Sequence, residues 1–189
     1  MDLFLETILM SSAFRAATGQ GKDTHTYRSK KPEETQKAYH EAKKQFREAF
    51  RDRIKRECQA YQAAQVDEAR WLGLIALVKN QLTEAHANIL NAGQLRVGTV
   101  QKMLSLALKF YWKSGENEKK PFWPPLDAQV IKASRKSLEK QDKGISWKKL
   151  DDSDQYARIM RAINKFAESR GFADASEWEY TIWETNDEL

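Results

Sequence analysis

Apolar side chains recur at steps of three and four along most of the chain, which is the spacing of helices that bury one face. No stretch of useful length alternates with the period of a strand, and no internal repeat is present. We therefore predict an all-α fold, a single compact multi-helix domain over residues 1–189. The predicted helices are 3–17, 32–65, 67–90, 98–113, 127–139, 151–170 and 175–185.

Capping and helix-breaking residues set the predicted ends of these helices. Pro32 suits a first helical turn, and Asp67 suits an N-cap. Gly93 and Gly171 suit helix C-termini, because glycine adopts the left-handed conformation easily. The polar, breaker-rich residues 18–31 predict a loop.

The helix predicted at 98–113 is the most apolar of the set. One narrow polar stripe, at steps of three and four, consists of Lys102, Ser105, Lys109 and Lys113. Helices that are apolar over most of their circumference pack deep in a domain. The stripe therefore faces either water or a cleft, and Lys102 lies at its buried-looking N-terminal end.

Composition excludes several kinds of site. The single cysteine, Cys58, rules out an intrachain disulfide and a cysteine-ligated iron–sulfur cluster. The three histidines, His25, His40 and His86, lack zinc-ligand spacing, so we expect neither metal nor cofactor. No window approaches the roughly 20 apolar residues of a membrane span, so we expect a cytoplasmic monomer without membrane contact.

Charge is uneven along the chain. The net charge is +5, but residues 174–189 hold six acids and no Lys or Arg, which leaves +11 on the rest. A basic body with an acidic, aromatic tail helix suggests a polyanion partner. The basic helix 32–65 either contacts phosphates or is a solvated surface, and its sequence leaves both readings open.

A proline-rich break precedes the helix predicted at 127–139. Residues 121–126 read Pro-Phe-Trp-Pro-Pro-Leu, and Asp127 then opens the next helix. Aspartate after a proline break is commonly only an N-cap, and Lys102 taken alone could be a solvated helix lysine.

Residues 93–133 together resemble the helix-hairpin-helix DNA glycosylase superfamily, and are most similar to its archaeal-type 8-oxoguanine branch. Gly98 stands where the superfamily has its hairpin glycine, Gln101 and Lys102 begin a similar lysine helix, and Pro124–Val130 is similar to the aspartate segment. The hairpin at 91–98 departs from the usual Leu-Pro-Gly-x-Gly pattern, and no cluster-binding cysteines follow.

The resemblance implies excision of a damaged or modified base from double-stranded DNA, with Lys102 and Asp127 as catalytic residues. A carboxylate stabilises oxocarbenium charge on the sugar. A lysine amine can attack C1′, form a Schiff base and permit strand cleavage, provided that it first loses its proton.

The remaining site predictions concern DNA contact. Backbone N–H groups at the helix start, with the charge of Arg96, could hold a phosphate. A flipped base needs stacking partners. The predicted DNA-binding residues are Arg96, Gly98, Thr99 and Lys109, and the candidate base-pocket aromatics are Trp71, Trp112, Phe122 and Trp123.

Several alternatives stay open. The base could be oxidised guanine, which suits DNA repair, or a bulky modified pyrimidine as in viral DNA, which suits antiviral defence. The protein could act with or without lyase activity. It could also be a non-catalytic helical nucleic-acid-binding protein, or a protein-interaction module.

Overall fold

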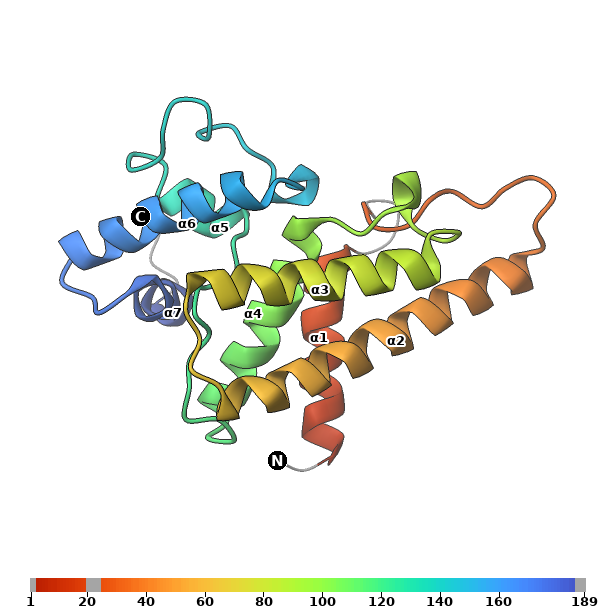
Figure 1. Ribbon diagram of the computed structural model, residues 1–189, viewed down its shortest axis with the longest axis horizontal. Helices are drawn as coiled ribbons and strands as arrows, with labels where there is room; N and C mark the ends of the chain where they lie inside the picture. Colours follow the sequence, from red (N-terminus) through yellow and green to blue (C-terminus); the bar gives the residue numbers. More distant parts are fainter. Residues whose placement is uncertain (1–2, 20–24, 186–189) are drawn as a thin grey trace.

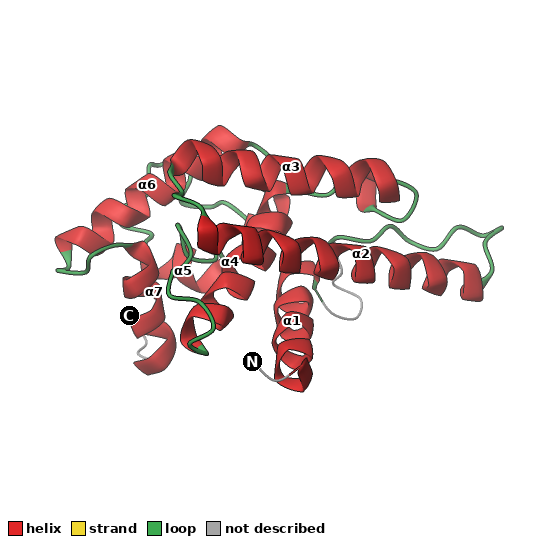
Figure 2. Cartoon of the chain, turned by 60° about the horizontal axis from the view of Figure 1, so that its bottom comes forward, coloured by secondary structure: helices red, strands yellow, loops and turns green. Residues whose placement is uncertain are grey.

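The computed structural model describes residues 3–19 and 25–185, and within them the fold is all-α, as predicted (Figure 2). Predictions for residues 20–24 and 186–189, in the loop and the acidic tail, lie outside the described residues. The helices are α1 (Leu3–Thr18), α2 (Gln36–Ala63), α3 (Glu68–His86), α4 (Val97–Lys113), α5 (Ala128–Ala133), α6 (Ser153–Ser169) and α7 (Ala175–Thr185). Over the same residues, no helix has the length and apolar character needed to cross a membrane.

Helix α4 is the centre of the packing. Helices α1, α2 and α3 pack against it, and α6 contacts both α3 and α4. Figure 1 shows α2 and α3 side by side across α1 and α4, with α5, α6 and α7 gathered at one end. Most of the apolar side chains of α4 are buried in this arrangement, with Leu106, Phe110 and Tyr111 partly buried, which confirms that the most apolar helix packs deep in the domain.

Aspartate side chains cap the helices that follow them, and Asp67 does so as the sequence predicts. The side chain of Asp67 accepts the N–H of Arg70 at 2.8 Å, and Asp152 accepts the N–H groups of Asp154 and Gln155. Gly171, with φ of +87°, follows the last turn of α6. Local chemistry determines these ends, so local sequence reveals them.

Three predicted helix boundaries were wrong, each because a competing contact intervenes. Helix α2 begins at Gln36, not Pro32, because Thr35 caps it and Glu34 is bound by the guanidinium of Arg28. Helix α5 ends at Ala133, not at 139, and the Ser134 hydroxyl donates to the carbonyl of Val130 at this end.

Helix α3 ends at His86 rather than Leu90 because the following residues pair with the segment after α1. Arg28 donates its N–H to Ile89, and Asn91 donates to Thr26, which forms a single antiparallel bridge. Gly93, with φ of +69°, therefore ends a short 3-10 turn instead of α3.

Candidate functional site

The structure brings Lys102 and Asp127 together. Lys102 lies in the second turn of α4, Asp127 immediately precedes α5, and Lys102 Nζ lies 3.4 Å from Asp127 Oδ2. The Lys102 side chain is 10% exposed and that of Asp127 is 22% exposed. The pair is thus mostly buried, with the carboxylate being the more accessible partner.

Asp127 uses its two carboxylate oxygens differently. Oδ1 accepts the backbone N–H groups of Gln129 at 2.9 Å and Val130 at 3.1 Å, so it caps α5. Oδ2 is the oxygen that faces Lys102. The cap therefore fixes the direction of the carboxylate while leaving one oxygen for other chemistry.

Gln101 fastens the segment before Asp127 to α4. Its buried amide donates to the carbonyls of Gly98 and Leu126, and its carbonyl accepts the N–H of Leu126 at 3.0 Å. A fully hydrogen-bonded buried amide holds its surroundings rigidly. The residue next to Lys102 thereby sets the position of the residue next to Asp127.

Two residues that sequence reasoning missed complete the surroundings of the pair. The Trp147 ring centroid lies 4.3 Å from Lys102 Nζ, and His25 packs edge-on against the same ring at 5.1 Å. His25 Nε2 also lies 3.3 Å from the hydroxyl of Thr99. No local pattern could have found either residue, because each lies in an irregular segment far from Lys102 in sequence.

Positively charged side chains act on His25 at the edge of the site. Burial lowers the pKa of His25 to about 4, and the positive charge of Lys148 adds to the effect, with smaller contributions from Lys102 and Arg96. The imidazole is therefore neutral at physiological pH.

The start of α4 does not offer the predicted phosphate site. The N–H of Gly98 donates to the Leu150 carbonyl at 2.9 Å, and that of Val97 donates to the Asp151 carboxylate at 3.3 Å. Thr99 is buried, and its N–H donates to Arg96. Of the residues predicted to contact DNA here, Gly98 and Thr99 are buried and Arg96 is partly exposed.

Lys109 is also misassigned as a DNA contact. Its side chain is 4% exposed, and Nζ donates to both carboxylate oxygens of Glu179 on α7, at 2.7 and 2.9 Å. The acidic tail helix thus covers this part of the polar stripe. Lys109 fastens α7 to α4 instead of meeting solvent.

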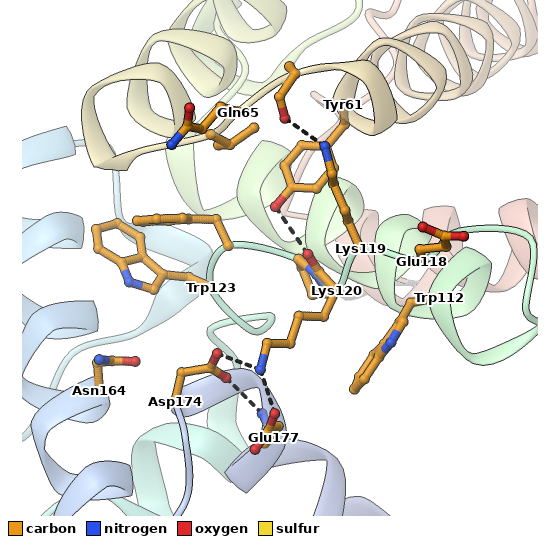
Figure 3. A pocket seen from close by; sticks show the side chains of 14 residues that line it. Tyr61, Gln65, Trp112, Glu118, Lys119, Lys120, Trp123, Asn164, Asp174 and Glu177 are labelled. Atoms are coloured by element: carbon orange, nitrogen blue, oxygen red, sulfur yellow. Dashed lines mark hydrogen bonds and ion pairs between the residues drawn. The ribbon is translucent and has the colours of Figure 1, made fainter.

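The predicted base-pocket aromatics do not gather at the pair. Trp71 is fully buried in the core, and its indole N–H donates to Tyr156 at 3.2 Å. Trp112, Phe122 and Trp123 line a cavity of about 750 Å³ (Figure 3). Trp112 lies ten residues beyond Lys102, roughly 15 Å along the helix axis.

Both lysines of this cavity are bound by neighbouring groups. Lys120 pairs with Asp174 at 2.7 Å and with Glu177 at 2.6 Å, and Lys119 donates to the final carbonyls of α2 (Figure 3). These contacts join the loop after α4 to α2 and α7. The cavity therefore reads as a junction between helices.

Other chemistry is limited in the part of the chain described. Cys58 is buried, and its burial raises the pKa of the thiol, which disfavours a nucleophilic role. Within residues 3–19 and 25–185, no three His, Cys, Asp or Glu side chains lie together as a metal-ligand set would. Comparison with protein-family models, curated proteins and solved structures finds no match for this chain.

Proposed function

We propose that this protein is a DNA glycosylase that excises a damaged or modified base, with Lys102 and Asp127 as its catalytic residues. One observation carries the proposal: Asp127 caps α5 through Oδ1 and presents Oδ2 to Lys102 Nζ at 3.4 Å. In this reading residues 93–133 form a helix-hairpin-helix-like element that presents the pair.

The arrangement suits cleavage of an N-glycosidic bond. As the bond between C1′ and the base breaks, positive charge develops on the sugar, and a fixed carboxylate stabilises it. Asp127 Oδ2 also lies where it could accept a proton from Lys102, which frees the amine lone pair for attack.

The amine would then form a bond to C1′ while the base leaves with the electrons of the glycosidic bond and takes up a proton. Opening of the sugar ring gives a protonated Schiff base. Loss of a C2′ proton then expels the 3′ phosphate, which cuts the strand. Lyase activity depends on Lys102, whereas base release through Asp127 could proceed with water.

The test combines base analysis with covalent trapping. DNA duplexes with oxidised guanine, bulky modified pyrimidines or an abasic site are incubated with the protein, and released bases are identified by mass spectrometry. Borohydride is added in parallel to trap a Schiff base. The identity of the base would separate a repair role from a defence role.

The chain offers matched controls for both residues. Asp152 caps α6 as Asp127 caps α5, so Asp152→Asn controls for the cap. Lys79 pairs with Asp151 at 2.9 Å, so Lys79→Gln controls for loss of an ion pair. We expect Asp127→Asn to slow base release on the order of 100-fold and Lys102→Gln to abolish the trapped adduct, with both controls near wild type. Unchanged base release in Asp127→Asn would refute the glycosylase proposal.

A second candidate is a non-catalytic DNA-binding protein. It is favoured by the exposed cations on α2, Lys37, Lys44, Arg47 and Arg56. Others on that helix are held internally, including Lys55 by Glu6 and Arg53 by Glu57. This alternative predicts salt-sensitive DNA binding without base release from any duplex.

A further inference from the structure

We propose that Trp147 is a positioning residue, whose indole face holds the Lys102 side chain toward Asp127. The inference rests on the proposed role of Lys102. Lysine has a flexible four-carbon stem, so a single carboxylate contact at 3.4 Å does not fix its amine. A ring face 4.3 Å from Nζ supplies a second contact from another direction.

The backbone of Trp147 is fixed against the start of α4. A side chain at Gly98 would place its Cβ only 1.8 Å from the Trp147 carbonyl oxygen, so glycine is what permits this close approach. The Gly98 N–H donates to Leu150 at the end of the same 3-10 turn, Trp147–Lys149. The turn carrying the ring is thus joined to the helix carrying Lys102.

The ring itself is held by a second contact. His25 packs against it edge-on, with an interplanar angle of 85°, and His25 Nε2 lies beside the Thr99 hydroxyl on α4. Because this imidazole is neutral at physiological pH, it adds no positive charge beside the Lys102 ammonium. Trp147 is 6% exposed, so little water reaches the ring. The attraction between its face and the Lys102 ammonium is therefore only weakly screened.

The contacts of Trp147 explain a feature that simple core packing does not. The face of a buried aromatic ring can pack against apolar neighbours alone, yet this one meets the ammonium of a mostly buried lysine. The presence of an ammonium beside the ring indicates that the ring is placed to contact Lys102, and not only to fill the core.

The test begins with a measurement that needs no activity. In protein labelled with ¹³C-lysine, ring currents from Trp147 shift the Lys102 Hε resonances upfield, and the Lys102→Arg spectrum assigns them. Trp147→Phe, which keeps an aromatic ring, retains most of the shift. Trp147→Leu, which keeps apolar bulk alone, loses it. Trp178→Leu, a buried aromatic change elsewhere, leaves the shift unaltered.

Trapping kinetics on abasic DNA form the second arm. We expect Trp147→Leu to slow adduct formation roughly tenfold at unchanged DNA affinity, Trp147→Phe to restore most of the rate, and Trp178→Leu to match wild type. Retention of the Lys102 shift in Trp147→Leu, or trapping by that variant at the wild-type rate, would overturn the inference.

The two arms separate this inference from the proposed function. If the wild-type protein forms no adduct and releases no base, the glycosylase proposal fails. The ring-current shift and its loss in Trp147→Leu would then still establish that the Trp147 ring face lies against the Lys102 side chain in solution.

Discussion

The buried ion pair between α4 and α7 gives the sharpest stability prediction. Lys109→Met removes the ammonium but keeps a similar apolar stem. Glu179 then lies 9% exposed in its side chain without the partner that now binds both of its carboxylate oxygens. Breaking a buried pair in this way costs about 3–5 kcal/mol, because one charge is left uncompensated. For a chain of this length that corresponds to a fall of about 10 °C in Tm.

The cost should depend on pH in a defined direction. Burial raises the pKa of Glu179 even in the wild type, while Lys109 opposes the rise. Removing Lys109 raises the pKa further, so the folded variant gains stability when the carboxyl is protonated. A raised carboxyl pKa means that stability falls as pH rises above the ordinary value of 4.5 toward the folded-state value. Lys109→Met is therefore expected to cost less at pH 5 than at pH 8.

Urea unfolding, monitored by fluorescence at pH 5 and at pH 8, measures the effect. Lys113→Met is the control, because Lys113 is exposed on the same stripe and its ammonium lies over the Trp112 and Tyr180 rings; it should cost under about 1 kcal/mol. The double variant Lys109→Met/Glu179→Leu should recover most of the loss, since an apolar pair leaves no buried charge. A Lys109→Met midpoint equal to that of the wild type, or a cost independent of pH, would refute the reasoning.

Three further predictions concern single positions. Gly98→Ala should cost about 3 kcal/mol in urea unfolding, because its Cβ meets backbone, whereas Gly73→Ala, which meets nothing within 4 Å, should be neutral or stabilise α3 by about 0.5–1 kcal/mol. His25 should stay neutral down to pH about 4 in an NMR titration. Since its folded pKa lies below the usual 6.5, its contribution to stability is present above pH 6.5 and is lost as pH falls toward 4; a midpoint near 6.5 would contradict the burial. Cys58 should react with a thiol reagent only on unfolding, so rapid labelling of the native protein would contradict its buried position.

Sequence pattern predicted the helices well where local chemistry decides them. The caps at Asp67 and Asp127 follow from a single side chain and its nearest N–H groups. The errors arose where contacts with other segments determine the end of a helix. Arg28 binds Glu34, which lies outside α2, and residues 26–28 pair with residues 89–91, which lie outside α3. Contacts of this kind leave no periodic signal.

The candidate site likewise has residues that local sequence could identify and residues that only tertiary packing places there. The order of glycine turn, lysine helix and aspartate segment led to the Lys102–Asp127 pair, which the structure does bring together. Trp147 and His25 could not be placed, since each meets the site through tertiary packing. The polar stripe of α4 was recognised, but not that the tail helix α7 covers Lys109.

Two lysines on that one stripe now differ in a way that bears on function. Lys109 makes two short contacts to a carboxylate that is nearly as buried, a geometry in which the pair satisfies both charges. Lys102 makes a single ion-pair contact of 3.4 Å to a more exposed carboxylate, whose other oxygen caps α5, and its Nζ also lies over the Trp147 ring at 4.3 Å. A long single contact contributes little to stability, while keeping Lys102 mostly buried costs desolvation. Lys109 is accounted for by the packing of α7, whereas the weaker pairing of the mostly buried Lys102 is the kind of local conflict that the proposed catalytic role would explain.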